Sequence, residues 1–100
     1  MKRKEIEEQV IKNYERDEQM MVFIFAQWCV NHALDPGELY KRAYPHQSAN
    51  HALQQAIDLT VPKEEAGNIP DDTLLNVLSL YGNDDLAFIV TEEIEKRNRY

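Results

Sequence analysis

The chain has 100 residues, a formal net charge of −7 at pH 7 and a single cysteine. A chain of this length has room for one hydrophobic core, so we expect one domain over residues 1–100. The lone cysteine excludes an internal disulfide, and the absence of a secretory signal or an 18-residue apolar run predicts a soluble, cytoplasmic protein.

The first predicted element is one long helix over residues 4–34. Its charged first half carries a narrow apolar stripe at i, i+4 and i+8, formed by Ile6, Val10 and Tyr14. Its second half, residues 20–30, is apolar nearly all round apart from Gln27, so other elements must cover it on several sides. A strand at residues 20–25 is the alternative, but no other stretch alternates in a way that could pair with it.

The second predicted helix has a complete start signal. Asp35 suits the N-cap, Pro36 the first helical position and Glu38 the third. The helix should end at Tyr44, because Pro45 disfavours a helical residue before it.

Three further helical segments follow. The third helix should be capped by Ser48 and end before Pro62, and the fourth should occupy residues 70–81 with Gly82 just after its end. The fifth should begin after residue 83 or 84 and bury Leu86, Ile89, Val90 and Ile94. Its outer side is predicted to carry three i, i+4 ion pairs, Glu92–Lys96, Glu93–Arg97 and Glu95–Arg99. The fold class is therefore all-α, a single-domain bundle of about five helices with a long N-terminal helix.

The length of the first helix predicts association. Thirty-one helical residues span about 45 Å, whereas a compact domain of this size has a radius of gyration near 13 Å. The helix must kink near residues 16–19 or project from the body. A projecting stripe of Ile6, Val10 and Tyr14 would need a partner, and a symmetric homodimer or another protein would supply one.

One set of residues has the chemistry of a metal site. Cys29, His32, His46 and His51 follow the spacing C-x2-H-x13-H-x4-H and offer the nitrogen and sulfur ligands that zinc takes. A zinc or thiol-based protein is therefore the alternative function. The simpler interpretation is a buried free cysteine, a histidine at a helix end and two surface histidines, so we expect no metal and no cofactor.

Residues 25–29, Phe-Ala-Gln-Trp-Cys, resemble the stretch before the active-site cysteine of thioredoxin-like proteins. The resemblance covers five residues of 100. The next residues, Val30, Asn31 and His32, include no resolving cysteine, and no predicted strands could form the scaffold. We assign no redox activity on this ground.

No catalytic motif stands out, and the paired acids at 71–72, 84–85 and 92–93 occupy helix starts or charged faces, so we expect no enzyme activity. Seven aromatic residues are expected in the core: Phe23, Phe25, Trp28, Tyr40, Tyr44, Tyr81 and Phe88.

The negative charge disfavours nucleic-acid binding, and we expect no membrane partner. The predicted function is a non-catalytic interaction or regulatory module of bacterial or phage type, acting through the first helix or the acidic C-terminal face. A small-molecule pocket around Trp28 is a third hypothesis.

Overall fold

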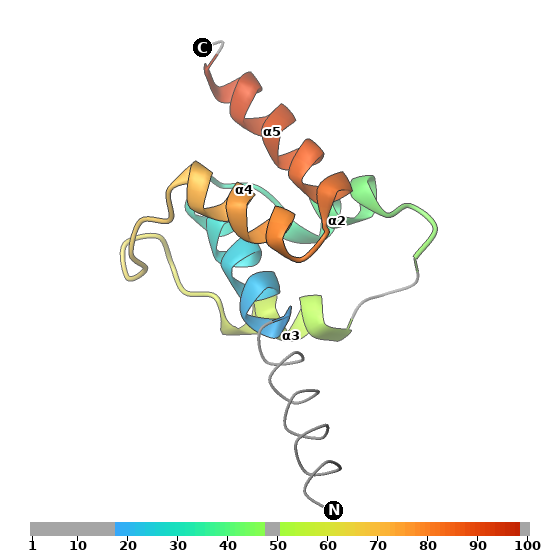
Figure 1. Cartoon of the computed structure of the whole chain (residues 1–100). Coiled ribbons are helices and arrows are strands. Elements are labelled where there is room, and N and C mark those ends of the chain that lie inside the picture. The colour runs from blue at the N-terminus through green and yellow to red at the C-terminus, as the bar shows by residue number, and fades with distance from the viewer. Residues whose placement is uncertain (1–17, 48–50, 99–100) are drawn as a thin grey trace, which may run out of the picture.

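The computed structural model describes residues 18–47 and 51–98, and within these ranges it is all-helical, as predicted, with no strand. Five helical segments are present in this part of the chain (Figure 1). They are residues 18–31, here named the central helix, α2 (Pro36–Ala43), α3 (His51–Leu59), α4 (Asp71–Leu80) and α5 (Asp84–Asn98). The predicted stripe of Ile6, Val10 and Tyr14, residues 16 and 17 of the predicted kink region and the Ser48 cap lie outside the described residues, so the long N-terminal helix stays a prediction.

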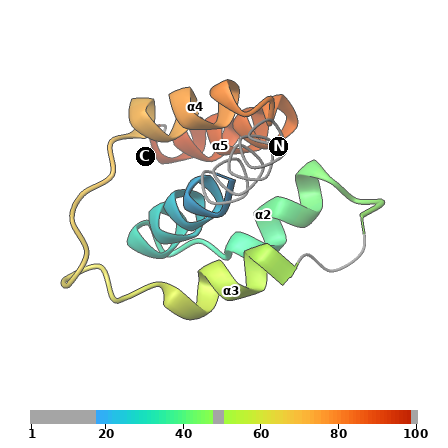
Figure 2. The same ribbon diagram turned by 60° about the horizontal axis from the view of Figure 1, so that its bottom comes forward.

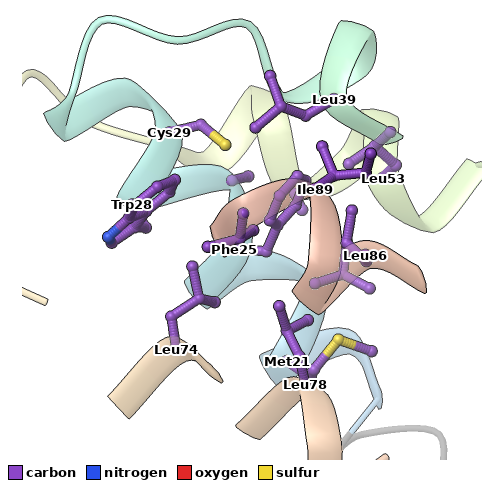
Figure 3. Packing of buried hydrophobic residues seen from close by; sticks show 14 residues of the cluster. Met21, Phe25, Trp28, Cys29, Leu39, Leu53, Leu74, Leu78, Leu86 and Ile89 are labelled. Atoms are coloured by element: carbon purple, nitrogen blue, oxygen red, sulfur yellow. The ribbon is translucent and has the colours of Figure 1, made fainter. Parts of the chain in front are cut away.

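The central helix lies between two pairs of helices. Figure 2 shows α4 and α5 on one side of it and α2 and α3 on the other. Phe25, Trp28 and Cys29 have no exposed surface, and Figure 3 shows them among side chains of the surrounding helices, including Leu39 and Leu74. The prediction that this apolar stretch is helical and covered on several sides is confirmed.

The start and end of α2 follow the predicted signals. Asp35 Oδ1 accepts hydrogen bonds from the backbone N–H groups of Gly37 at 2.9 Å and Glu38 at 3.3 Å. Pro36 occupies the first turn, where its missing N–H has no consequence. Tyr44 forms the C-cap and donates its backbone N–H to Tyr40.

The central helix and α4 end in the same hydrogen-bonded turn with different residues. After α4, Gly82 takes a φ of 72°, and Asn83 N–H donates to the carbonyl of Leu78 at 2.8 Å. After the central helix, Ala33 takes a φ of 58°, and Leu34 N–H donates to the carbonyl of Cys29 at 2.8 Å. Both are Schellman motifs, but only glycine adopts this backbone region without a steric penalty.

Two buried amides attach the loop between α3 and α4 to the central helix. Gln27 donates Nε2 to the carbonyl of Val61 at 2.9 Å, and its Oε1 accepts from Val61 N–H at 3.0 Å. The same Nε2 lies 3.1 Å from Oδ1 of Asn31, whose Nδ2 donates to the carbonyl of Gly67 at 3.4 Å. Gln27, which only interrupts the apolar pattern in the sequence, thus satisfies loop backbone groups that would otherwise be unpaired.

One of the predicted core aromatics is on the surface. Phe88 in α5 is 65% exposed, whereas its neighbours Leu86, Ile89 and Val90 are buried as predicted. The prediction for Phe88 is wrong because α5 buries the face opposite this ring, at 100° per residue. Ile94 is partly buried against the core.

Candidate functional site

A shallow pocket of about 270 Å³ lies between the end of the central helix and the C-terminal half of α5. Six side chains line it: Trp28, His32, Leu34, Glu93, Lys96 and Arg97. Ligand pockets usually measure about 300–1,000 Å³, so this one is small. Trp28 forms its floor but has no exposed surface, which leaves His32, Leu34 and the charged side chains as its accessible rim.

A polar cluster joins three helices beside this pocket. Asp71, the first residue of α4, accepts a hydrogen bond from Trp28 Nε1 at 3.0 Å. It also forms an ion pair with Arg97 of α5. Arg97 Nη1 also lies 2.9 Å from Nδ1 of His32, whose ring packs 4.7 Å from the Trp28 ring. The cluster therefore satisfies the buried indole N–H and ties the end of α5 to the central helix.

The surroundings of His32 favour its neutral form. Burial lowers its pKa below the ordinary value of 6.5, and the positive charges of Arg97 and Lys63 lower it further, while Asp71 acts in the opposite direction. A neutral ring nitrogen can accept the hydrogen bond from the Arg97 guanidinium, which a protonated imidazole could not do. The histidine therefore takes part in a hydrogen-bonded contact between the end of the central helix and α5.

The ion pairs of α5 differ from those predicted. Glu93 lies 2.7 Å from Arg42 of α2 and 3.6 Å from Lys96, and Glu92 lies 3.5 Å from Arg42. The hydrogen bond from Arg42 lowers the pKa of Glu93. The predicted pairs Glu92–Lys96 and Glu93–Arg97 are wrong. Both acids pair with Arg42 of α2. Lys96 pairs with Glu93, and Arg97 pairs with Asp71 of α4. The third predicted pair contains Arg99, which is outside the described residues.

The four candidate zinc ligands do not form a site. Cys29 is in the core, where burial and the nearby carboxylates of Asp35 and Glu93 raise the pKa of its thiol far above the usual range. His46 and His51 are exposed. No group of three or more His, Cys, Asp and Glu side chains in residues 18–47 and 51–98 is placed to hold a metal ion.

The surface of α5 opposite the core carries a second candidate site. At 100° per residue, six residues lie on or near one stripe that faces away from Leu86, Ile89 and Val90. This outer face of α5 consists of Asp84, Asp85, Phe88, Thr91, Glu92 and Glu95. Phe88 is close to the middle of the stripe, with acidic residues one turn before it and one turn after it.

Part of these sites is predictable from the sequence. The acidic C-terminal helix is a predicted candidate surface, whereas the sequence pattern places Asp71 only at a helix start and Arg97 only in a helical ion pair. Neither assignment could reveal their meeting with His32, because the contact joins residues 26 and 65 positions apart in the chain. The one available signal was the indole N–H of Trp28, which needs a hydrogen-bond acceptor when it is buried.

None of the helices in the described part of the chain is long and apolar enough to cross a membrane.

The comparisons with known proteins agree on one family. A protein of Bacillus subtilis (strain 168), the uncharacterized protein YxiS, is 53% identical over 94 residues, which cover 93% of this chain and 98% of the relative. No solved structure matches the chain significantly. The family model of YxiS matches residues 2–95, and the chain therefore belongs to the YxiS family.

Proposed function

We propose that the chain is a non-catalytic protein–protein interaction module that binds another protein through the outer face of α5. The observation that carries this proposal is the 65% exposure of Phe88 on a helix whose opposite face is packed into the core. Covering a phenyl ring contributes about 1.5–3 kcal/mol, so this ring gives a partner a ready apolar anchor.

The position of Phe88 distinguishes it from the other exposed apolar residues. Leu59 and Leu80 are also exposed, at 69% and 78%, but each is the last residue of its helix. Met20 is 56% exposed within the central helix, but its side chain is flexible and unbranched, unlike a rigid phenyl ring. Phe88 lies within a regular helix, where its backbone is fixed before binding. Aromatic side chains held in this way are among the residues that contribute most at interfaces.

The other candidate functions have less support. The buried, protonated thiol of Cys29 is a poor metal ligand and a poor nucleophile, because both roles need the thiolate. The pocket near Trp28 is small, and its apolar floor is covered from solvent. The charged side chains that line it already have partners within the protein.

Photo-crosslinking in the cells that make the protein tests this proposal. A benzoylphenylalanine at position 88 should give a defined adduct with a partner, and the same group at Leu59 serves as the control because that side chain is equally exposed. An adduct at 88 that is weak or missing at 59 supports the proposal. No adduct at 88, or the same adducts from both positions, would contradict it. An adduct of twice 11.7 kDa would identify a second copy as the partner.

A further inference from the structure

The two faces of α5 differ in how their carboxylates are compensated. On the side facing α2, Glu93 has a side chain only 13% exposed and holds both Arg42 and Lys96. On the outer face, Glu92 reaches Arg42 at 3.5 Å. No ion pair joins the three remaining acids of that face, Asp84, Asp85 and Glu95, to a cation in the described part of the chain. The exposed ring of Phe88 therefore has two carboxylates without an ion-pair partner one turn before it and a third two turns after it.

The exposed ring and the acidic residues near it together favour a positively charged partner. An apolar surface alone would accept many occupants, but an acidic rim attracts positive charge and repels negative charge during the encounter. Arginine suits such a face particularly well, because its guanidinium pairs with carboxylates and can stack on an aromatic ring. Asp84 and Asp85 precede Phe88 by one helical turn and Glu95 follows it by two, a spacing that matches a second helix or an extended segment lying along α5.

We propose that the outer face of α5 binds a positively charged segment of a partner protein, with an apolar side chain of that segment on Phe88 and its Arg or Lys residues opposite Asp84, Asp85 and Glu95. This inference rests on the proposed function and names the class of partner.

A second copy of the chain does not fit this face. A symmetric dimer sets the same patch of each copy against the other. At the outer face of α5 this would oppose the uncompensated acids of one copy to those of its partner, and like charges across an interface are strongly unfavourable. We therefore expect any homodimer contact of the chain to lie outside the outer face of α5.

Binding of a designed peptide to the full-length protein tests this inference. The probe is a fluorescent amphipathic helix of about five turns, with leucines along one face and arginines beside them, here called the Leu/Arg peptide. Its counterpart carries glutamines in place of the arginines. We expect the Leu/Arg peptide to bind, the glutamine peptide to bind at least about tenfold more weakly, and the affinity for the Leu/Arg peptide to fall as salt is raised.

Variants of the protein locate the binding to the outer face. The set Asp84→Asn, Asp85→Asn and Glu95→Gln should weaken binding of the Leu/Arg peptide about tenfold, from three exposed charge pairs of ordinary strength. A control set at the end of α3 and in the next loop, Asp58→Asn, Glu64→Gln and Glu65→Gln, removes the same number of negative charges and should leave the affinity unchanged. All six acids are exposed, so both proteins should fold, and circular dichroism verifies this.

Several results would overturn the inference. If the two sets of variants weaken binding equally, the peptide responds to net charge alone. If the glutamine peptide binds as tightly as the Leu/Arg peptide, the face selects no charge. A homodimer that Phe88→Ala dissociates would show that the face binds a second copy.

The inference and the proposed function fail in different ways. Crosslinking at position 88 to a partner whose contact segment is not basic would retain the interaction module and reject the inference. Absence of any adduct at position 88 would reject the proposed function itself, whatever the designed peptide does.

Discussion

The central helix and α5 differ in how much of their surface is packed against other helices. From residue 21 onward the central helix is packed against other helices, and even the polar Gln27 and Asn31 are buried and hydrogen-bonded to the chain. In α5 one face is packed and the other leaves a phenyl ring and several carboxylates in solvent. The difference indicates that substitutions in the central helix should change stability, whereas those on the outer face of α5 should change binding.

The largest expected difference is between two phenylalanines. Phe25 has no exposed surface, so Phe25→Ala should lower the free energy of unfolding by about 3–5 kcal/mol through lost burial and a cavity. Phe88→Ala should change it by no more than about 0.5 kcal/mol. Urea unfolding followed by circular dichroism measures both. Similar losses for the two variants would remove the distinction between the two helices.

The next effect concerns the buried amide of the central helix. Gln27→Ala should cost about 1–3 kcal/mol, because the backbone N–H and carbonyl of Val61 lose their partner in a partly buried position. Gln55→Ala in α3 is the matched control, since Gln55 is exposed and should have little effect. Hydrogen exchange gives a second measurement, because the Val61 amide should exchange faster in Gln27→Ala alone. Unchanged exchange would show that the amide does not hold the loop.

The two helix ends should respond to substitution with opposite signs. Ala33→Gly should stabilise the protein by about 1 kcal/mol, because it removes the penalty of a side chain at positive φ. Gly82→Ala should destabilise it by a similar amount. A Cβ at position 82 would meet no atom within 4 Å, so this cost is one of backbone conformation and not of space. Thermal unfolding of both variants checks the pair, and a loss of stability in Ala33→Gly would contradict the account.

The smallest effect is a dependence on pH through His32. Its pKa is lower in the folded protein than the ordinary value of 6.5, so the unfolded chain binds the proton more readily. The stabilising contribution is complete above about pH 6.5 and is lost as the pH falls through the folded pKa. His32→Gln should flatten this part of the stability profile, measured by urea unfolding between pH 7.5 and 5. An unchanged slope in the variant would assign it to other groups.

The fold was predictable wherever the signal was local. The cap at Asp35, the end of α4 at Gly82 and the buried positions of α5 follow from spacing and from backbone preferences of single residues. The apolar stretch from residue 20 to residue 30 correctly predicted a helix that other elements enclose. These features depend on residues that are close together in the chain.

The remaining features depend on contacts between distant residues. The sequence pattern of α5 suggested ion pairs along the helix, but Arg42 and Asp71 approach from other helices and take those partners. Phe88 was expected in the core on the basis of residue type alone, although its helical position faces away from the buried stripe. The spacing of Leu86, Ile89 and Val90 already places Phe88 on the opposite face of the helix. For predicting burial in a helix, this spacing is a better guide than residue type.

The most direct test of the central claim is to measure unfolding and peptide binding in the same variant, Phe88→Ala. If the outer face of α5 serves binding and not folding, the free energy of unfolding stays within about 0.5 kcal/mol of the unmodified protein. In the same preparation the affinity for the Leu/Arg peptide should fall at least about tenfold, as expected for an aromatic anchor. A variant that loses stability but binds the peptide unchanged would contradict the account.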